Sequence, residues 1–273
     1  MKYKLIVCDV DGTLLDSRFI FNQTDKDAIA KAIKQGVRFA ICSGRAYKSL
    51  RDFAGELGLA QQGDYIVSFN GALIYDPFNR KVVMKKDLDK QLAIETIKLC
   101  KGLGRNIETI LYTDGENCIC EKDAVYFSQY QKASLVDWRE ADNIIAAAKE
   151  TPSISKIVFI AKNDVLKTLE AQLQNSFGNS VGIVFSSHYL LEVIPKDCDK
   201  AGGLRWLCHQ MRIDISQTIA IGDNHNDISM IKQAGLGVAV ANAVQPAKDA
   251  ADYVTINDCA NGAVAEVINK YIL

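Results

Sequence analysis

The sequence predicts an α/β protein with a parallel-sheet core and an inserted α+β domain. Short apolar runs alternate with helical patterns at both ends of the chain, which is typical of a parallel sheet. Between these ends the pattern changes, because strand-like runs there alternate polar and apolar positions and lie closer together. The chain has 273 residues, enough for two domains of ordinary size.

The first portion of the core begins with a strand. Residues 4–9 form a continuous apolar run, which suits a strand covered on both faces. A helix follows, with Thr24 predicted as its N-cap and Gly36 just past its end. The remaining elements of this portion are a strand at 37–42, a helix at 46–57 and a strand at 65–69.

The last portion of the chain repeats the same alternation, and its strands can share one sheet with the first portion. The expected elements are a helix at 200–211, a strand at 218–221, a helix at 227–234, a strand at 237–240 and a helix at 261–271.

The middle of the chain has mixed signals and is predicted to be an inserted domain over residues 83–188. Residues 1–82 and 189–273 then form a discontinuous core. The expected elements of the middle are strands at 80–86, 154–161 and 180–187, helices at 89–102 and 165–177, and a hairpin made by 107–115 and 116–122.

Composition narrows the classes of partner. The chain is 48% hydrophobic and 24% charged, with a net charge of −1 and basic residues scattered among acids, so no nucleic acid is expected. Acids arrive by Asp9, too early for a signal-peptide core or a membrane span. Most of the eight cysteines fit buried, reduced thiols, and the predicted location is the cytoplasm.

Polar residues follow the predicted strands at the point where each strand ends. Ligands of an open parallel sheet bind outside the carboxyl ends of its strands, so these residues are expected to converge. They are Asp9 and Asp11 after the first strand, Ser43, Gly44 and Arg45 after the second, Asn70 and Gly71 after the third, and residues 222–227 after the strand at 218–221.

Three carboxylates in one place require a compensating cation. Asp9, Asp223 and Asp227 would give the oxygen-rich shell that Mg²⁺ prefers. A carboxylate beside Mg²⁺ can attack a phosphoryl group, and Asp9 is placed for this. Asp11 would protonate the departing alcohol and then take a proton from water, while Gly12 lets the backbone turn beside the phosphate.

Donors are also needed for the phosphoryl oxygens, and Ser43 and Lys200 are the candidates. Several side chains keep two interpretations: Asn226 could hold Lys200 or an aspartate, Arg45 could bind the substrate or form a surface salt bridge, and Asn70 fits an ordinary turn as well as a substrate contact. Taken alone, the Asp-Gly pair at 11–12 fits a turn. The predicted substrate-binding residues are Gly12, Gly44, Arg45, Asn70 and Asn226.

Together these residues resemble the haloacid dehalogenase superfamily, and within it the Cof-like phosphatases that carry an α/β cap. The motifs are DVDGTLL at 9–15, ICSGR at 41–45, FNGALIYD at 69–76, the lysine at 200, and the run from 221 to 243 that begins IGDNHND. The resemblance spans essentially the whole chain. It implies a Rossmann-like three-layer core with a parallel sheet, plus an inserted α+β cap domain.

The resemblance also implies roles for single residues. Asp9 would be the nucleophile and Asp11 the acid and base, with a main-chain carbonyl of Asp11 on Mg²⁺. Ser43 and Lys200 would bind the phosphoryl group. Asp223 and Asp227 would lie at the metal.

The predicted function is therefore a Mg²⁺-dependent phosphatase of small phosphorylated metabolites, such as sugar phosphates or phosphorylated cofactors, that works through an aspartyl-phosphate. One alternative is a phosphosugar mutase, which needs basic groups for a second phosphate, and Lys156, Lys122 and Arg105 are available. Another is a sensor that binds a phosphometabolite without turnover. The individual metabolite and the oligomeric state are left open.

Overall fold

The computed structural model describes residues 2–104, 106–127 and 135–273, which form two compact units. The first unit comprises Met1–Gly44, Leu50–Val83 and Asp199–Leu273, and the second comprises Arg45–Ser49 and Met84–Cys198. Each unit has its own sheet. The predicted α/β class, with a largely parallel core sheet and a second α+β unit, is confirmed.

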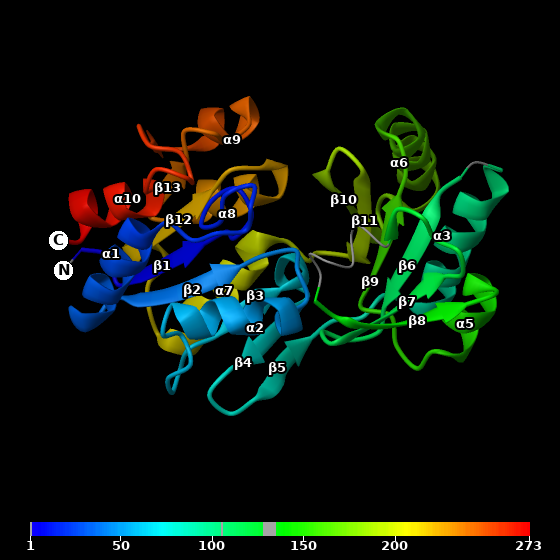
Figure 1. Cartoon of the computed structure of the whole chain (residues 1–273), viewed down its shortest axis with the longest axis horizontal. Coiled ribbons are helices and arrows are strands. Elements are labelled where there is room, and N and C mark those ends of the chain that lie inside the picture. The colour runs from blue at the N-terminus through cyan, green and yellow to red at the C-terminus, as the bar shows by residue number, and fades with distance from the viewer. Residues whose placement is uncertain (1, 105, 128–134) are drawn as a thin grey trace. The chain divides into compact units, whose positions relative to one another are not determined.

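The sheet of the first unit places β1 (Leu5–Cys8) between β2 (Arg38–Cys42) and β12 (Thr218–Gly222), parallel to both. Figure 1 shows the N-terminal strand β1 in blue beside β12 in orange, although the two lie far apart in the sequence. All four residues of β1 are buried, as the continuous apolar run predicts.

The other strands extend this sheet on both sides. On one side of β12 lie β13 (Leu236–Ala239) and β14 (Tyr253–Val254), both parallel. On the far side of β2 lies β3 (Ile66–Ser68), also parallel, followed by the antiparallel strand β4 (Leu73–Asp76) and the edge strand β5 (Lys81–Lys85). The carboxyl ends of β1, β2, β3 and β12 therefore meet at one edge.

Helices of the first unit follow the strands as βα units require. They are α1 (Gln23–Lys34), α7 (Lys200–Met211), α8 (Ile228–Gln233), α9 (Gln245–Ala250) and α10 (Ala263–Tyr271), with α2 (Tyr47–Glu56) crossing from the second unit into the first. Short 3₁₀ turns are η1 (Phe69–Gly71), η2 (Ile215–Gln217) and η3 (His225–Asp227). The first and last of these helices, α1 and α10, pack against each other.

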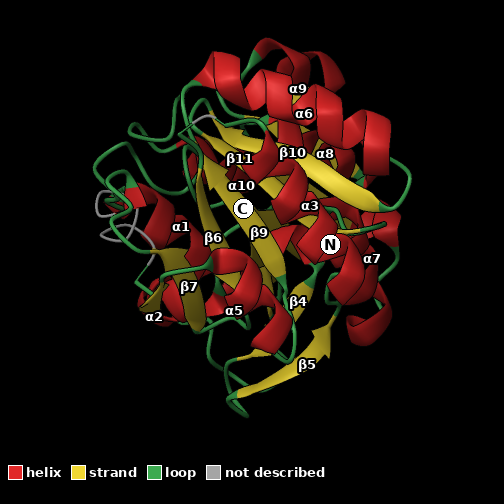
Figure 2. Cartoon of the chain, turned by 90° about the vertical axis from the view of Figure 1, so that its right-hand side faces the viewer, coloured by secondary structure: helices red, strands yellow, loops and turns green. Residues whose placement is uncertain are grey.

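The second unit has a sheet in the order β10, β11, β9, β6, β7, β8. Its strands are β6 (Glu108–Tyr112), β7 (Asn117–Glu121), β8 (Asp137–Ala141), β9 (Lys156–Ile160), β10 (Val181–Ser187) and β11 (Leu190–Pro195). Its helices are α3 (Lys90–Gly102), α5 (Ile144–Glu150) and α6 (Asn163–Phe177), drawn in red in Figure 2. Helix and strand residues such as Ile97, Phe159 and Leu173 share one apolar core.

The structure contains elements that the sequence did not predict, namely β4, β8, β11, β14, α5 and α9. Two further differences concern a helix cap and the bounds of the second unit. The first helix takes its N-cap from Asn22, whose side chain accepts the N–H of Thr24 at 2.8 Å, so Thr24 is not the cap. The predicted insertion, 83–188, stops before β11, which pairs with β9 and β10, and the second unit runs to Cys198. That the two units act as catalytic core and cap stays a prediction.

Within residues 2–104, 106–127 and 135–273, every helix is too short or too polar to cross a membrane.

Candidate active site

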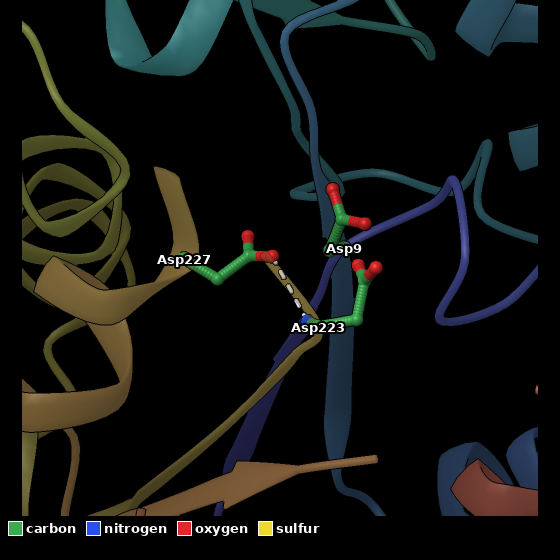
Figure 3. A group of neighbouring side chains, drawn as sticks. All are labelled: Asp9, Asp223 and Asp227. Atoms are coloured by element: carbon green, nitrogen blue, oxygen red, sulfur yellow. Dashed lines mark hydrogen bonds between the residues drawn. The ribbon is translucent and has the colours of Figure 1, made fainter. Parts of the chain in front are cut away.

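Three buried or partly buried carboxylates meet at the carboxyl ends of β1 and β12. Because these strands are parallel neighbours, the residue after each one emerges at the same edge. The backbone N–H of Asp9 donates to the carbonyl of Ile221 at 2.9 Å. One oxygen each of Asp9, Asp223 and Asp227 lies within 4.8 Å of the other two, and Figure 3 shows the carboxylates of Asp9 and Asp223 side by side.

A lysine compensates part of this negative charge. Lys200, the first residue of α7, is fully buried, and its Nζ donates to Oδ1 of Asp9 and Oδ1 of Asp227. Asp199, directly before it, caps the helix by accepting the N–H of Gly202 at 2.7 Å. Three carboxylates and one ammonium leave two uncompensated negative charges, which a divalent cation would balance.

The pKa values reflect this crowding. Burial, followed by the charge of Asp227, raises the pKa of Asp9 well above its ordinary value. Burial and the same neighbour raise the pKa of Asp223 to about 7. Burial lowers the pKa of Lys200, but the carboxylates of Asp227 and Asp9 outweigh it, so the net shift is upward. The negative charge of the three carboxylates therefore exceeds the positive charge of Lys200.

Asp227 also organises its own turn. Its Oδ2 accepts the backbone N–H groups of Asp223 at 3.0 Å and Asn224 at 2.9 Å, and the first of these is the dashed line in Figure 3. Gly222 is required beside it, because a Cβ there would lie 2.4 Å from the Cβ of Asp227. Both oxygens of Asp227 are thus engaged, one by the turn and one by Lys200.

The loop after β1 turns back on itself next to Asp223. Gly12 has a φ of +80°, and a Cβ on it would lie 2.6 Å from Oδ2 of Asp223. The hydroxyl of Thr13 donates to Oδ1 of Asp223 at 3.0 Å. Asn242 donates its side-chain amide to the carbonyl of Gly12 at 2.7 Å and accepts the N–H of Cys259 at 2.9 Å. Asp11, half-buried, adds a negative charge that also raises the pKa of Asp9.

The loops after β2 and β3 form the other wall of the site. Ser43 is buried, its N–H donates to the carbonyl of Val67 at 2.9 Å, and its carbonyl accepts the N–H of Asn70 at 3.0 Å. Asn226 donates its side-chain amide to Oδ1 of Asn70 at 3.1 Å. This bond joins the loop after β3 to the loop after β12.

The structure therefore brings most of the predicted residues together within the first unit. Arg45 is grouped with the second unit, and its role in binding the substrate stays a prediction. His225, in the same turn as Asp227, is exposed. The sequence reasoning missed the bond of Thr13 to Asp223, which spans 210 residues, and the two hydrogen bonds of Asn242. The sequence signal that included Asn242 was its place within the motif run from 221 to 243.

The donor set fits an oxygen-preferring divalent ion. Every candidate ligand atom in the cluster is a carboxylate oxygen, and cysteine and histidine contribute none. Mg²⁺ prefers such oxygen donors, whereas zinc sites are usually built with nitrogen or sulfur ligands. The N–H groups of the turn donate to Oδ2 of Asp227, and these two bonds use no side-chain oxygen of Asp9 or Asp223.

Comparisons with known proteins place this arrangement in a family. The sequence pattern of haloacid dehalogenase-like hydrolases matches residues 6–268. A Bacillus subtilis protein named 5-amino-6-(5-phospho-D-ribitylamino)uracil phosphatase YcsE is 28% identical, with 99% of this chain and 96% of that protein covered. Phosphatase YwpJ of the same species is 26% identical, with 95% and 96% covered.

A solved structure has the same fold. A haloacid dehalogenase-like hydrolase from Bacteroides thetaiotaomicron superposes with a TM-score of 0.86 at 29% sequence identity. The superposition covers 98% of this chain and 99% of that one. The similarity therefore extends over both units and both sheets.

Proposed function

The chain belongs to the haloacid dehalogenase-like hydrolase family, and from this premise we propose that it is a Mg²⁺-dependent phosphatase of small phosphorylated metabolites. The expected enzyme class, a phosphatase, agrees with the names of its relatives. The observation that carries the proposal is the cluster of Asp9, Asp223 and Asp227 with Lys200 between them.

Asp9 and Asp223 would hold Mg²⁺ through side-chain oxygens and Asp11 through its main-chain carbonyl. Asp227, whose two oxygens are already engaged, would act by fixing the turn that carries Asp223 and by holding Lys200. When bound, Mg²⁺ neutralises the charge on the phosphoryl oxygens and on the nearby carboxylates.

Asp9 is the proposed nucleophile. Its carboxylate oxygen attacks phosphorus, the bond from phosphorus to the ester oxygen breaks, and an aspartyl-phosphate forms. Asp11 gives its proton to the departing alkoxide, so that a neutral alcohol leaves. Asp11 then takes a proton from water as that water attacks the aspartyl-phosphate, which releases inorganic phosphate and restores Asp9.

The phosphoryl oxygens need donors while this happens. Lys200 supplies a buried ammonium already in contact with Asp9, and Ser43 supplies a hydroxyl after the neighbouring strand β2. Gly12 and Gly44 keep space beside the group, since a Cβ on either would press on a neighbouring side chain of the site. Asn226 holds the loop after β12 against the loop after β3.

The substrate class rests on the relatives and stays a proposal. One relative is named as a phosphatase of a phosphorylated ribitylaminouracil, which is a small metabolite. This supports a small phosphate monoester and does not identify it. The absence of a nucleic-acid partner and the cytoplasmic location also stay predictions.

The mutase alternative gains no support from its basic residues. Lys156 is buried and pairs with Glu192 at 3.0 Å inside the second unit. Lys122 is exposed and pairs with Asp142 at 3.0 Å. Arg105 lies outside the described residues. Both described lysines are therefore already paired with a carboxylate, so neither is a free cation for a second phosphate.

The test is release of inorganic phosphate from a panel of phosphorylated metabolites with Mg²⁺. Asp9→Asn should abolish release, because an amide is a poor nucleophile, while Asp52→Asn on the exposed face of α2 serves as the matched control. Turnover by Asp9→Asn at the wild-type rate would remove the nucleophile. Activity that appears only with a bisphosphate activator would favour the mutase.

A further inference from the structure

The turn after β3 has an unusual backbone. Its three residues, Phe69, Asn70 and Gly71, have φ values of 51°, 53° and 95°, and all three are buried. A left-handed conformation costs a non-glycine residue about 1–2 kcal/mol, so a run containing two of them is unfavourable in isolation. Such backbone is retained where the surrounding structure or a function requires it.

Packing explains part of this turn. A Cβ on Gly71 would lie 2.3 Å from the carbonyl oxygen of Asp199, the N-cap of α7. The turn therefore lies directly against the helix end that carries Lys200. This contact accounts for the glycine, but it makes no use of the side-chain amide of Asn70.

That amide has one partner and one unused donor. Asn70 is 1% exposed, and its Oδ1 accepts the amide of Asn226 at 3.1 Å. Within the described ranges, its Nδ2 has no hydrogen-bond partner. Leaving a buried donor without a partner costs about 1–3 kcal/mol. Proteins keep few such groups, and each one needs an explanation.

The surroundings of the donor identify its ligand class. A Cβ on Gly44 would lie 3.2 Å from Nδ2 of Asn70, so the donor lies beside the Ser43–Gly44 loop. The other side of the amide touches Asn226, which stands between Asp223 and Asp227 in the sequence. An unpaired N–H in this position is suited to an anionic oxygen.

We propose that Nδ2 of Asn70 donates a hydrogen bond to an oxygen of the phosphoryl group that Asp9 attacks, and that Asn226 fixes the amide so that this donor faces the substrate. The inference rests on the proposed function, because it assigns Asn70 to the same phosphoryl group. It makes Asn70 a binding residue that contacts substrate and Asn226 a positioning residue that acts through it.

Asn70→Asp tests the donor without removing the turn. Aspartate has the same size, tolerates the left-handed conformation and still accepts the amide of Asn226. It loses only the N–H donors and adds a charge that repels phosphate. In other enzymes, removal of one hydrogen-bond donor to a developing anion lowers kcat by on the order of 10²–10³. We therefore expect kcat/KM for p-nitrophenyl phosphate to fall about 10²-fold or more. Gln61→Glu, the same chemical change on an exposed turn, is the control.

A purely structural role predicts a different result. Activity of Asn70→Asp within about twofold of the wild type, with unchanged inhibition by inorganic phosphate, would overturn the inference. Should Asn70→Asp fail to fold, the wild-type protein still supplies the answer, because the side-chain NH₂ resonances of Asn70 must shift in nuclear magnetic resonance spectra as inorganic phosphate is added with Mg²⁺. Resonances that stay in place at saturation refute the assignment.

The two proposals fail separately. Absence of phosphate release from every ester would overturn the phosphatase proposal, while the phosphate titration would still report on the Asn70 donor. Conversely, a fully active enzyme whose Asn70 resonances ignore inorganic phosphate would leave the phosphatase in place and remove Asn70 from its binding site. Failure of inorganic phosphate to bind the wild-type protein would also count against the donor.

Discussion

Asp25 on α1 is a buried carboxylate whose titration should be measurable as a change in stability. Its Oδ1 accepts the backbone N–H of Ala265 at 2.6 Å, in the first turn of α10. That helix starts after Gly262, which has a φ of +87° and offers no side-chain cap, so Asp25 takes this role from another helix. Burial raises the pKa of Asp25 from 3.8 to about 6, although the bonds from α10 oppose the shift.

The sign of the effect follows from that upward shift. The folded protein holds the proton of Asp25 to a higher pH than the unfolded chain does, so stability from this group is fully present below the unfolded pKa and is lost as pH rises through the folded one. A shift of about two units corresponds to ~3 kcal/mol. Asn has the same shape, accepts the N–H of Ala265 and does not titrate.

Urea unfolding of the wild type and Asp25→Asn, with Mg²⁺ held constant, measures this difference. Between about pH 4 and about pH 7.5, Asp25→Asn should gain ~3 kcal/mol in unfolding free energy relative to the wild type. The control is Asp27→Asn on the same helix, where the carboxylate is exposed. A difference between wild type and Asp25→Asn that does not change with pH would refute the reasoning.

Three further predictions concern the site. Gly12→Ala places a Cβ 2.6 Å from Oδ2 of Asp223 at a φ of +80°, so phosphate release should fall at least 10²-fold (about 2.7 kcal/mol), as steady-state kinetics would report. Asn242→Ala removes the bonds to Gly12 and Cys259 and should cost about 1 kcal/mol in urea unfolding. Removing Mg²⁺ with a chelator should stop turnover. When the ion is first present at 100 times its Kd, its removal should also lower the free energy of unfolding by about 2.7 kcal/mol. An unchanged Tm would contradict the metal site.

Local patterns in the chain predicted much of this protein, because the end of a buried strand is a local signal. The run before Asp9, the Ser43–Gly44 step and the turn at 222–227 each identified a strand end, and parallel pairing brings such ends to one edge. The position of Lys200 at the start of α7 also followed from its helical pattern. The bounds of the inserted unit were harder to predict, since β11 joins the second sheet through its pairing with β9 and β10, and a local sequence pattern does not encode strand pairing.

The sequence alone determined the fold class, the edge of the sheet where the candidate site lies and the carboxylates that converge there, since strand period and strand-end residues are encoded within a few positions. Only the tertiary structure decided which side chains meet across long separations. Asp25 reaches α10 over 240 residues, Thr13 reaches Asp223 over 210, and Asn226 reaches Asn70 over 156. Such contacts depend on how distant segments pack, and no periodicity within a segment carries that information.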